Sequence, residues 1–354
     1  MEFCIAIKQY CIVLDIFNEL RLIIEDSRCE PLLLQTLLRG RPHRLTPHRH
    51  LAGMKSLLSV VGPSTIDPQN PLSTSTSLER RASFWNFARA DYQAAYVNHT
   101  TTLLDTEDLQ IWQSCGLQAT SAECLYFDPD SIKSDSNYRS STIQLVAHTL
   151  LWILLRTMNY LAASTTQDLP TRQALWDQLT SQLDTWHANL PLAFQPSAQL
   201  RHPLSRRSST TTTTQAGAQT QTQPTQPQTS SITELFFPIP LSAATLQLYH
   251  FARIILLLSK PTPPTQQHRL QTYRSISAQA LSHAHTIIGI ALARPHFSVR
   301  VEMLLPLVAA GSCLEDDGER RLVVEVLRAV EADTGVGTEG RVRELEGEWG
   351  VVIS

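Results

Sequence analysis

The densest run of apolar side chains lies at positions 83–98, SFWNFARADYQAAYVN. Its apolar residues recur at the spacing of one helix face: Phe84, Ala88, Tyr92 and Ala95. Trp85, Phe87 and Tyr96 flank that face. Each large aromatic side chain removes roughly 150–250 Å² from water when it is buried. The pattern therefore predicts a core helix, with Ser83 as its N-cap.

Helical periodicity continues along the chain. Residues 141–163 are apolar nearly all round, which predicts the central and most buried helix. Asp168 or Thr171 can cap the next helix, which carries a stripe of Trp176, Leu179, Leu183 and Trp186. Further helical patterns cover 3–24, 29–38, 51–61, 105–117, 241–259, 270–293, 319–333 and a last stretch with Val342, Leu345 and Trp349. We expect an all-α fold, an irregular helical array or bundle.

Residues 201–232 differ in character, with five consecutive Thr, a Gln/Thr/Pro repeat and no aromatic or acidic residue. Nothing there can offset the entropy of ordering, so we expect one long disordered internal linker. The Pro-, Ser- and Thr-rich stretch 62–78 and the polar stretch 128–140 are expected to be loops. The predicted organisation is 1–47 as N-terminal helices and a basic loop, 48–200 and 233–354 as two parts of one helical domain, and 201–232 as an insertion.

The composition of the chain narrows the classes of function that it can have. The chain has 354 residues, 42% of them hydrophobic and 17% charged, with a net charge of −3. A surface that binds nucleic acid through its phosphates normally carries clustered positive charge. The net charge of −3 shows no such excess of positive charge. The six cysteines have no zinc-ligand spacing, so we interpret them as reduced and buried. The longest apolar run, Leu145 to Leu155, is shorter than the roughly 20 residues of a membrane span. We expect a soluble intracellular protein with no membrane partner.

Residues 39–50, RGRPHRLTPHRH, form the one basic patch and carry three histidines. Three interpretations remain open: a solvated connector, a phosphate-contacting patch, or a histidine metal site. The histidine spacing matches no common ligand frame, which weighs against the metal site.

The order Phe84-Trp85-x-Phe87-x-Arg89-x-Asp91, then Asn98, then Leu103-Leu104-Asp105, resembles the fungal-specific transcription factor domain, the regulatory region of zinc-cluster (Zn2Cys6-type) regulators. That family usually has Gln where this chain has Ala90. Similar stretches run from Trp176 to Pro196, from Tyr249 to Pro261 and on to the last helix. The resemblance covers roughly residues 48–350.

The resemblance implies a transcription regulator of the fungal type that resides in the nucleus and controls RNA polymerase II-dependent gene expression. It implies that DNA is contacted only through a zinc cluster, and that this cluster is not in this chain. Zinc is expected only in that cluster. Partners implied are a homo- or hetero-dimer with related regulators and a small-molecule effector. The aromatic interior near Trp85, Trp152 and Trp186 could hold the effector, although these side chains also fit a plain core role.

Motifs for catalysis are weak. Gly335-Val336-Gly337-Thr338-Glu339-Gly340 spells a dinucleotide fingerprint but follows a helical pattern where a strand is needed, so helix-stop glycines explain it better. Glu315-Asp316-Asp317 could hold a cation, but an acidic turn before a helix N-terminus is the simpler interpretation. His283 and His285 are two residues apart on a helix and do not face each other. His250 fits a hydrogen-bonded core or rim histidine better than a catalytic base.

We expect no catalytic, cofactor-binding or metal-binding residue and no enzyme activity. Two alternatives stay open: an all-α enzyme, which would need paired carboxylate motifs for its metal, and a truncated partner that captures and dampens a related regulator. Within the linker, Arg206-Arg207-Ser208-Ser209 fits the motif of kinases that favour basic residues, so Ser209 is a candidate phosphorylation site. The alternative is that this stretch is an unmodified basic segment. Arg80-Arg81-Ala82-Ser83 is a weaker candidate.

Overall fold

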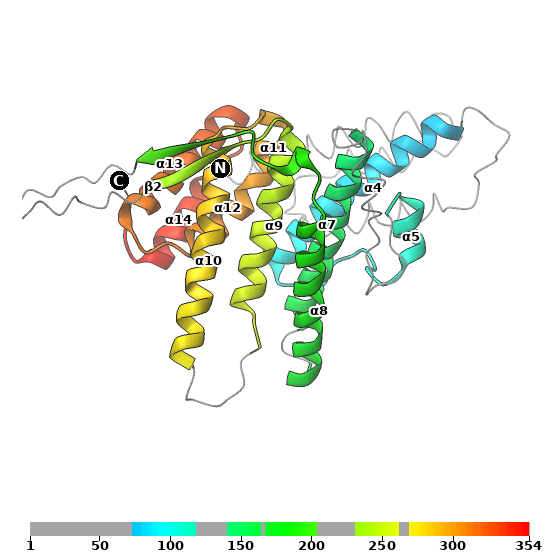
Figure 1. Cartoon of the computed structure of the whole chain (residues 1–354), viewed down its shortest axis with the longest axis horizontal. Helices are drawn as coiled ribbons and strands as arrows, with labels where there is room; N and C mark the ends of the chain where they lie inside the picture. Colours follow the sequence, from blue (N-terminus) through cyan, green and yellow to red (C-terminus); the bar gives the residue numbers. More distant parts are fainter. Residues whose placement is uncertain (1–72, 118–139, 164–166, 204–230, 262–268, 354) are drawn as a thin grey trace, which may run out of the picture.

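The computed structural model describes residues 73–117, 140–163, 167–203, 231–261 and 269–353 (Figure 1). The expected helices at 3–24, 29–38 and 51–61, the basic loop 39–50, and Ser209 lie outside these residues. The α-helices are α4 Ser73–Asn98, α5 Leu109–Ser114, α7 Ser140–Ala162, α8 Leu169–Ala188, α9 Pro240–Leu258, α10 Arg269–Leu292, α11 Phe297–Arg300, α12 Leu304–Gly311, α13 Asp317–Thr334 and α14 Glu339–Trp349. The fold is mostly helical, as the sequence predicts.

The helix α4 begins ten residues before its predicted start, at Ser73, so the predicted cap at Ser83 and the loop expected at 73–78 are wrong. Ser and Thr are only mildly unfavourable inside a helix, and extending a formed helix needs no new nucleus. The buried face is as predicted, with Phe84, Ala88, Tyr92 and Ala95 all at 6% exposure or less. Ser83 is buried in mid-helix, and its hydroxyl has no hydrogen-bond partner within the described part of the chain.

The helix α7 is the central helix, as predicted, and packs against α4, α8 and α9. Its residues Trp152 to Leu155 are fully buried. The helix α8 begins where the sequence places it, because the Asp168 side chain accepts a hydrogen bond from the Thr171 N–H and Pro170 occupies the first turn. Both α7 and α9 have the length and composition of a membrane span, but 72% and 78% of those windows are buried inside the structure. Burial within the array accounts for their apolar character.

An antiparallel two-stranded hairpin, β1 Ala198–Pro203 and β2 Ser231–Phe236, covers part of the helical array (Figure 1). Its register pairs Ala198 with Phe236 and Pro203 with Ser231. The boundaries predicted for the disordered segment are therefore wrong at both ends, since 201–203 and 231–232 are strand residues. β2 packs on α10, and Ile232 is 1% exposed in the core, so tertiary burial stabilises strands that have little local signal.

The hydrophobic core draws on residues from both sides of segment 204–230. It includes Trp152 of α7, Phe251 of α9, Ile287 of α10 and Leu345 of α14. Two short 3-10 helices, Leu192–Phe194 and Val301–Met303, complete the described elements.

Candidate functional site

The charged residues of the α4 aromatic helix have structural partners. Asp91 is 2% exposed, and its carboxylate accepts hydrogen bonds from the backbone N–H groups of Leu103 (2.9 Å) and Leu104 (2.8 Å). Arg89 forms an ion pair with Glu302, at 3.4 Å between Nε and Oε1. Burial raises the pKa of that Glu302 carboxyl. These contacts join α4 to the loop that follows it and to the segment before α12.

The three tryptophans proposed to line an effector site are core residues, with 2% exposure or less for Trp85, Trp152 and Trp186. Each of the chain's six tryptophans donates its indole N–H to a backbone carbonyl: Trp85 to Cys115, Trp112 to Asp105, Trp152 to Thr106, Trp176 to Leu256, Trp186 to Val146 and Trp349 to Gly311. Three of these bonds run between two helices, from α8 to α9, from α8 to α7 and from α14 to α12. A buried indole N–H needs an acceptor, and in these three cases the acceptor connects two helices.

A histidine pair lies between α9 and α10. The Nδ1 atoms of His250 and His283 are 2.8 Å apart, so one ring donates and the other accepts. Burial lowers the pKa of His250 to about 3 and that of His283 to about 4, with Arg253 and His187 adding smaller repulsion. The interpretation of His250 as a hydrogen-bonded histidine is confirmed.

His285 and the acidic turn at Asp316 also have structural roles. His285 does not face His283 but pairs with Glu319 on α13, at 3.0 Å between Nε2 and Oε1. The Asp316 carboxylate caps α13 by accepting from the N–H groups of Gly318 and Glu319. In the ranges that the structure covers, no group of three His, Cys, Asp or Glu side chains is placed to hold a metal ion.

The glycine fingerprint at 335–340 belongs to a helix stop and the next helix start. Gly335 ends α13 in the left-handed conformation with φ 65°, as predicted, and its N–H donates to the Glu331 carbonyl. Thr338 then precedes α14, and its N–H and hydroxyl both donate to the Glu331 carboxylate at 2.9 and 2.7 Å. The polar groups of this turn are thus used within the fold.

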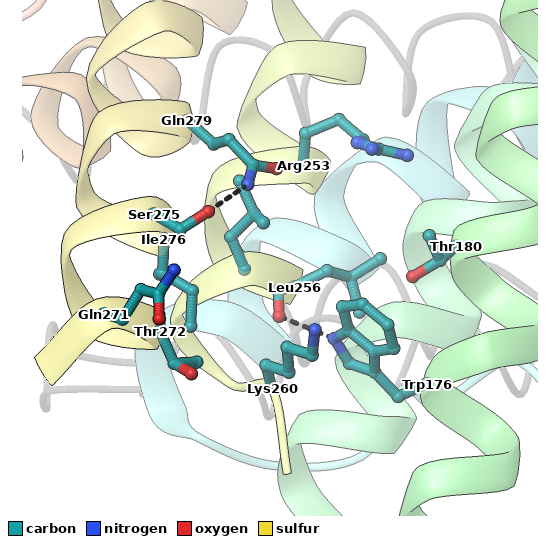
Figure 2. Close-up of a pocket in the computed structure, with 11 residues that line it drawn as sticks. Trp176, Thr180, Arg253, Leu256, Lys260, Gln271, Thr272, Ser275, Ile276 and Gln279 are labelled. Atoms are coloured by element: carbon teal, nitrogen blue, oxygen red, sulfur yellow. Dashed lines mark hydrogen bonds between the residues drawn. The ribbon is translucent and has the colours of Figure 1, made fainter. Parts of the chain in front are cut away.

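A cavity of about 340 Å³ lies between α8, α9 and α10, where these helices extend past the rest of the array (Figures 1 and 2). The helix α8 supplies Trp176 and Thr180, and α9 with the residue pair after it supplies Arg253, Leu256, Leu257 and Lys260. The helix α10 supplies Gln271, Thr272, Ser275, Ile276 and Gln279. A volume of this size is at the lower end of the range for small-molecule sites.

The charges around the cavity are unbalanced. Its lining contains Arg253 and Lys260 but no acidic residue. The Arg253 guanidinium pairs with Asp184 of α8, whereas Lys260 has no carboxylate partner among the described residues. The Lys260 ammonium instead lies 4.8 Å from the centre of the Trp176 ring.

Polar and apolar surfaces alternate along this cavity. The Trp176 indole donates to the Leu256 carbonyl at 2.7 Å, and that carbonyl also accepts from the Ser259 hydroxyl at 3.2 Å, which satisfies the last turn of α9 (Figure 2). The Thr180 hydroxyl oxygen is buried and has no hydrogen-bond partner in the described structure. Leu256 and Ile276 provide apolar surface.

Sequence patterns point to only part of this cavity. The pattern places Trp176 on the apolar stripe of the helix that follows Asp168, and it places Lys260 at the helix end before Pro261. Neither position indicates a cavity by itself, because the third wall comes from α10, which follows in the chain after residues 262–268. The lining thus depends on how three helices pack.

The fold and these contacts define a helical protein whose aromatic and charged core residues connect helices. In comparisons with known proteins, the chain is similar to the transcription activator AMTR1 of Alternaria alternata, at 32% identity over 331 residues. The match covers 85% of this chain and 41% of that protein, so the chain spans about two fifths of the relative's length. No family model and no solved structure matches the chain. The chain is therefore related to a fungal transcription activator.

Proposed function

We propose that this chain is the regulatory region of a fungal transcription regulator and not an enzyme. The observation that carries the proposal is the match to a fungal transcription activator, which covers 85% of the chain at 32% identity. The aromatic order on α4 and its resemblance to the fungal-specific transcription factor domain support the same conclusion. Nuclear residence and control of RNA polymerase II transcription belong to this proposal.

Partners are part of the same proposal. DNA contact comes from a zinc-cluster module outside this chain, consistent with the chain's net charge of −3. A second copy or a related regulator, and a small effector molecule, are the expected partners. The role of the array is to change the activity of the attached regulator when such a partner binds.

Tethering tests the proposal. The full chain is fused to an unrelated DNA-binding module and targeted to a reporter promoter in a fungal host. A several-fold change in reporter transcription, relative to the DNA-binding module alone, is the expected result. Reporter output equal to that of the module alone would contradict the proposal, provided that immunoblotting shows equal protein levels.

A further inference from the structure

We propose that the cavity between α8, α9 and α10 binds a small amphipathic carboxylic acid in its anionic form. The regulatory meaning of this binding rests on the function proposed above, but the binding itself is argued from the cavity. The sequence prediction placed an effector near Trp85, Trp152 and Trp186, whose packing leaves them in the core. The cavity is a different place, and none of those three residues lines it.

The charge of the ligand follows from the lining. Among the described residues that form the walls, Lys260 is a cation without a carboxylate partner, and no wall residue is acidic. In the last turn of α9, the Leu256 carbonyl already accepts from Trp176 and Ser259. An anionic oxygen is therefore the complement that the lysine ammonium lacks, and charged hydrogen bonds are the stronger kind.

Thr180 supplies a second hydrogen-bond donor for the carboxylate head of the ligand. Its hydroxyl is buried, unpartnered within the described chain, and directed toward the cavity in Figure 2. A buried hydroxyl without a partner is costly, and a ligand oxygen would relieve that cost. Thr180 lies on α8, whereas Lys260 follows α9, so the two donors come from different walls of the cavity.

The body of the ligand follows from the apolar surface. Leu256, Leu257 and Ile276 line the cavity together with the Trp176 ring. A volume of about 340 Å³ accommodates a single aromatic ring or a short aliphatic chain, and is too small for a nucleotide cofactor. Of the two cations in the lining, Arg253 is paired with Asp184, so Lys260 is the one that lacks a carboxylate among the described residues. One available cation, the unpartnered Thr180 hydroxyl and the apolar side chains favour a monocarboxylate over a phosphate-rich ligand.

Three probes with the same body and different heads test the proposal: 4-phenylbutyrate, its neutral amide and the corresponding amine. Binding to the purified full chain is measured by isothermal titration calorimetry. We expect the carboxylate to bind about tenfold or more tightly than the amide, and the amine to bind most weakly. No binding of 4-phenylbutyrate, or equal affinity for the three heads, would overturn the proposal.

Variants separate binding from folding. Lys260→Met keeps the length of the side chain and removes its charge, and we expect about tenfold weaker binding, whereas Lys260→Arg should keep most of the affinity. Thr180→Val removes a hydroxyl that has no partner, so it should weaken binding without lowering the melting temperature. Arg343→Met on α14, where the side chain is 67% exposed, is the matched control and should leave the affinity unchanged. Wild-type affinity in both Lys260→Met and Thr180→Val would overturn the proposal.

The tethered reporter distinguishes the two proposals. If 4-phenylbutyrate binds but the tethered chain leaves transcription unchanged, the proposed function fails and the site stands. If the tethered chain changes transcription but the calorimetry shows no binding, the site fails and the function stands.

Discussion

Single residues fix how closely the elements approach. Gly289 of α10 lies against β2, where an added Cβ would be 2.1 Å from the Thr233 carbonyl oxygen. That distance is far inside van der Waals contact with a backbone atom, which cannot move without shifting the strand. Gly289 therefore sets the distance between the hairpin and the helix. The sequence shows a glycine in a helical pattern but not the strand that explains it.

Gly289→Ala should destabilise the protein by about 1–3 kcal/mol, because the new methyl group overpacks the contact between α10 and β2. Chemical denaturation followed by circular dichroism measures the change in the free energy of unfolding. The matched control is Gly347→Ala in α14, where an added Cβ meets no atom within 4 Å and alanine favours the helix. A loss no greater than that of the control would show that the hairpin does not lie against Gly289 in solution.

The His250–His283 pair predicts acid sensitivity. Its folded pKa values of about 3 and about 4 lie below the ordinary 6.5, so the unfolded chain binds more protons between those limits. Stability should therefore fall as the pH drops from about 6.5 toward 4, by at most about 1.4 kcal/mol per pH unit for each histidine. Arg253 and His187 act on both histidines, and the Tyr249 ring contacts both. Asp184 faces Arg253 and His187.

His283→Asn keeps a hydrogen-bonding atom near the Nδ1 position but does not titrate. The drop in melting temperature between pH 7 and pH 5 should be smaller in this variant than in the wild-type chain. His99→Asn is the control, since His99 is exposed with φ 54° and asparagine tolerates that conformation. An equal drop in all three proteins would contradict the assignment.

At the scale of elements, the helices follow from local sequence and the hairpin does not. The cap at Asp168, the apolar α7 and the stop at Gly335 depend on neighbouring residues, so their patterns were sufficient. The strands β1 and β2 pair across segment 204–230, and β1 ends in a proline. Their stability comes from packing on α10, which no local pattern contains. The early start of α4 was missed for a related reason, since Ser and Thr suit a cap and a helix interior almost equally.

The register of the hairpin makes segment 204–230 replaceable. Pro203 and Ser231 are paired across the sheet, so a two-residue Asn-Gly turn can join the strands. We expect the shortened chain to keep its helical circular dichroism and to unfold with equal stability or up to about 2 kcal/mol more, because the loop to be closed is shorter.

A Gly/Ser segment of the original length is the matched control and should leave the stability near that of the wild-type chain. Loss of helical signal in the Asn-Gly variant, with the Gly/Ser variant intact, would show that the register of the hairpin is different.

At the scale of the whole molecule, the core contains residues from before and after segment 204–230, and indole hydrogen bonds join α7 to α8, α8 to α9 and α12 to α14. Under the proposed function, this connected core would carry the effect of binding at one place to the rest of the array. The candidate cavity could not be predicted from the sequence, because its walls come from α8, α9 and α10, whose packing sets which side chains meet.

The isolated chain should bind DNA weakly. Its net charge is −3, and the proposal places DNA contact in another module. In an electrophoretic mobility shift assay, binding should be absent or should disappear between about 50 and 200 mM salt, as expected for phosphate contacts alone. A site-specific shift that survives this salt range would place a DNA-binding surface within the chain.

The central claim is that the folded helical array itself regulates transcription. The most direct measurement compares the promoter-tethered wild-type chain with a tethered Trp152→Asp variant, which places a charge at a fully buried position of α7. We predict a several-fold change in reporter transcription for the wild-type chain and none for the variant at equal protein level. An unchanged reporter with the wild-type chain, or equal activity of both proteins, would contradict the account.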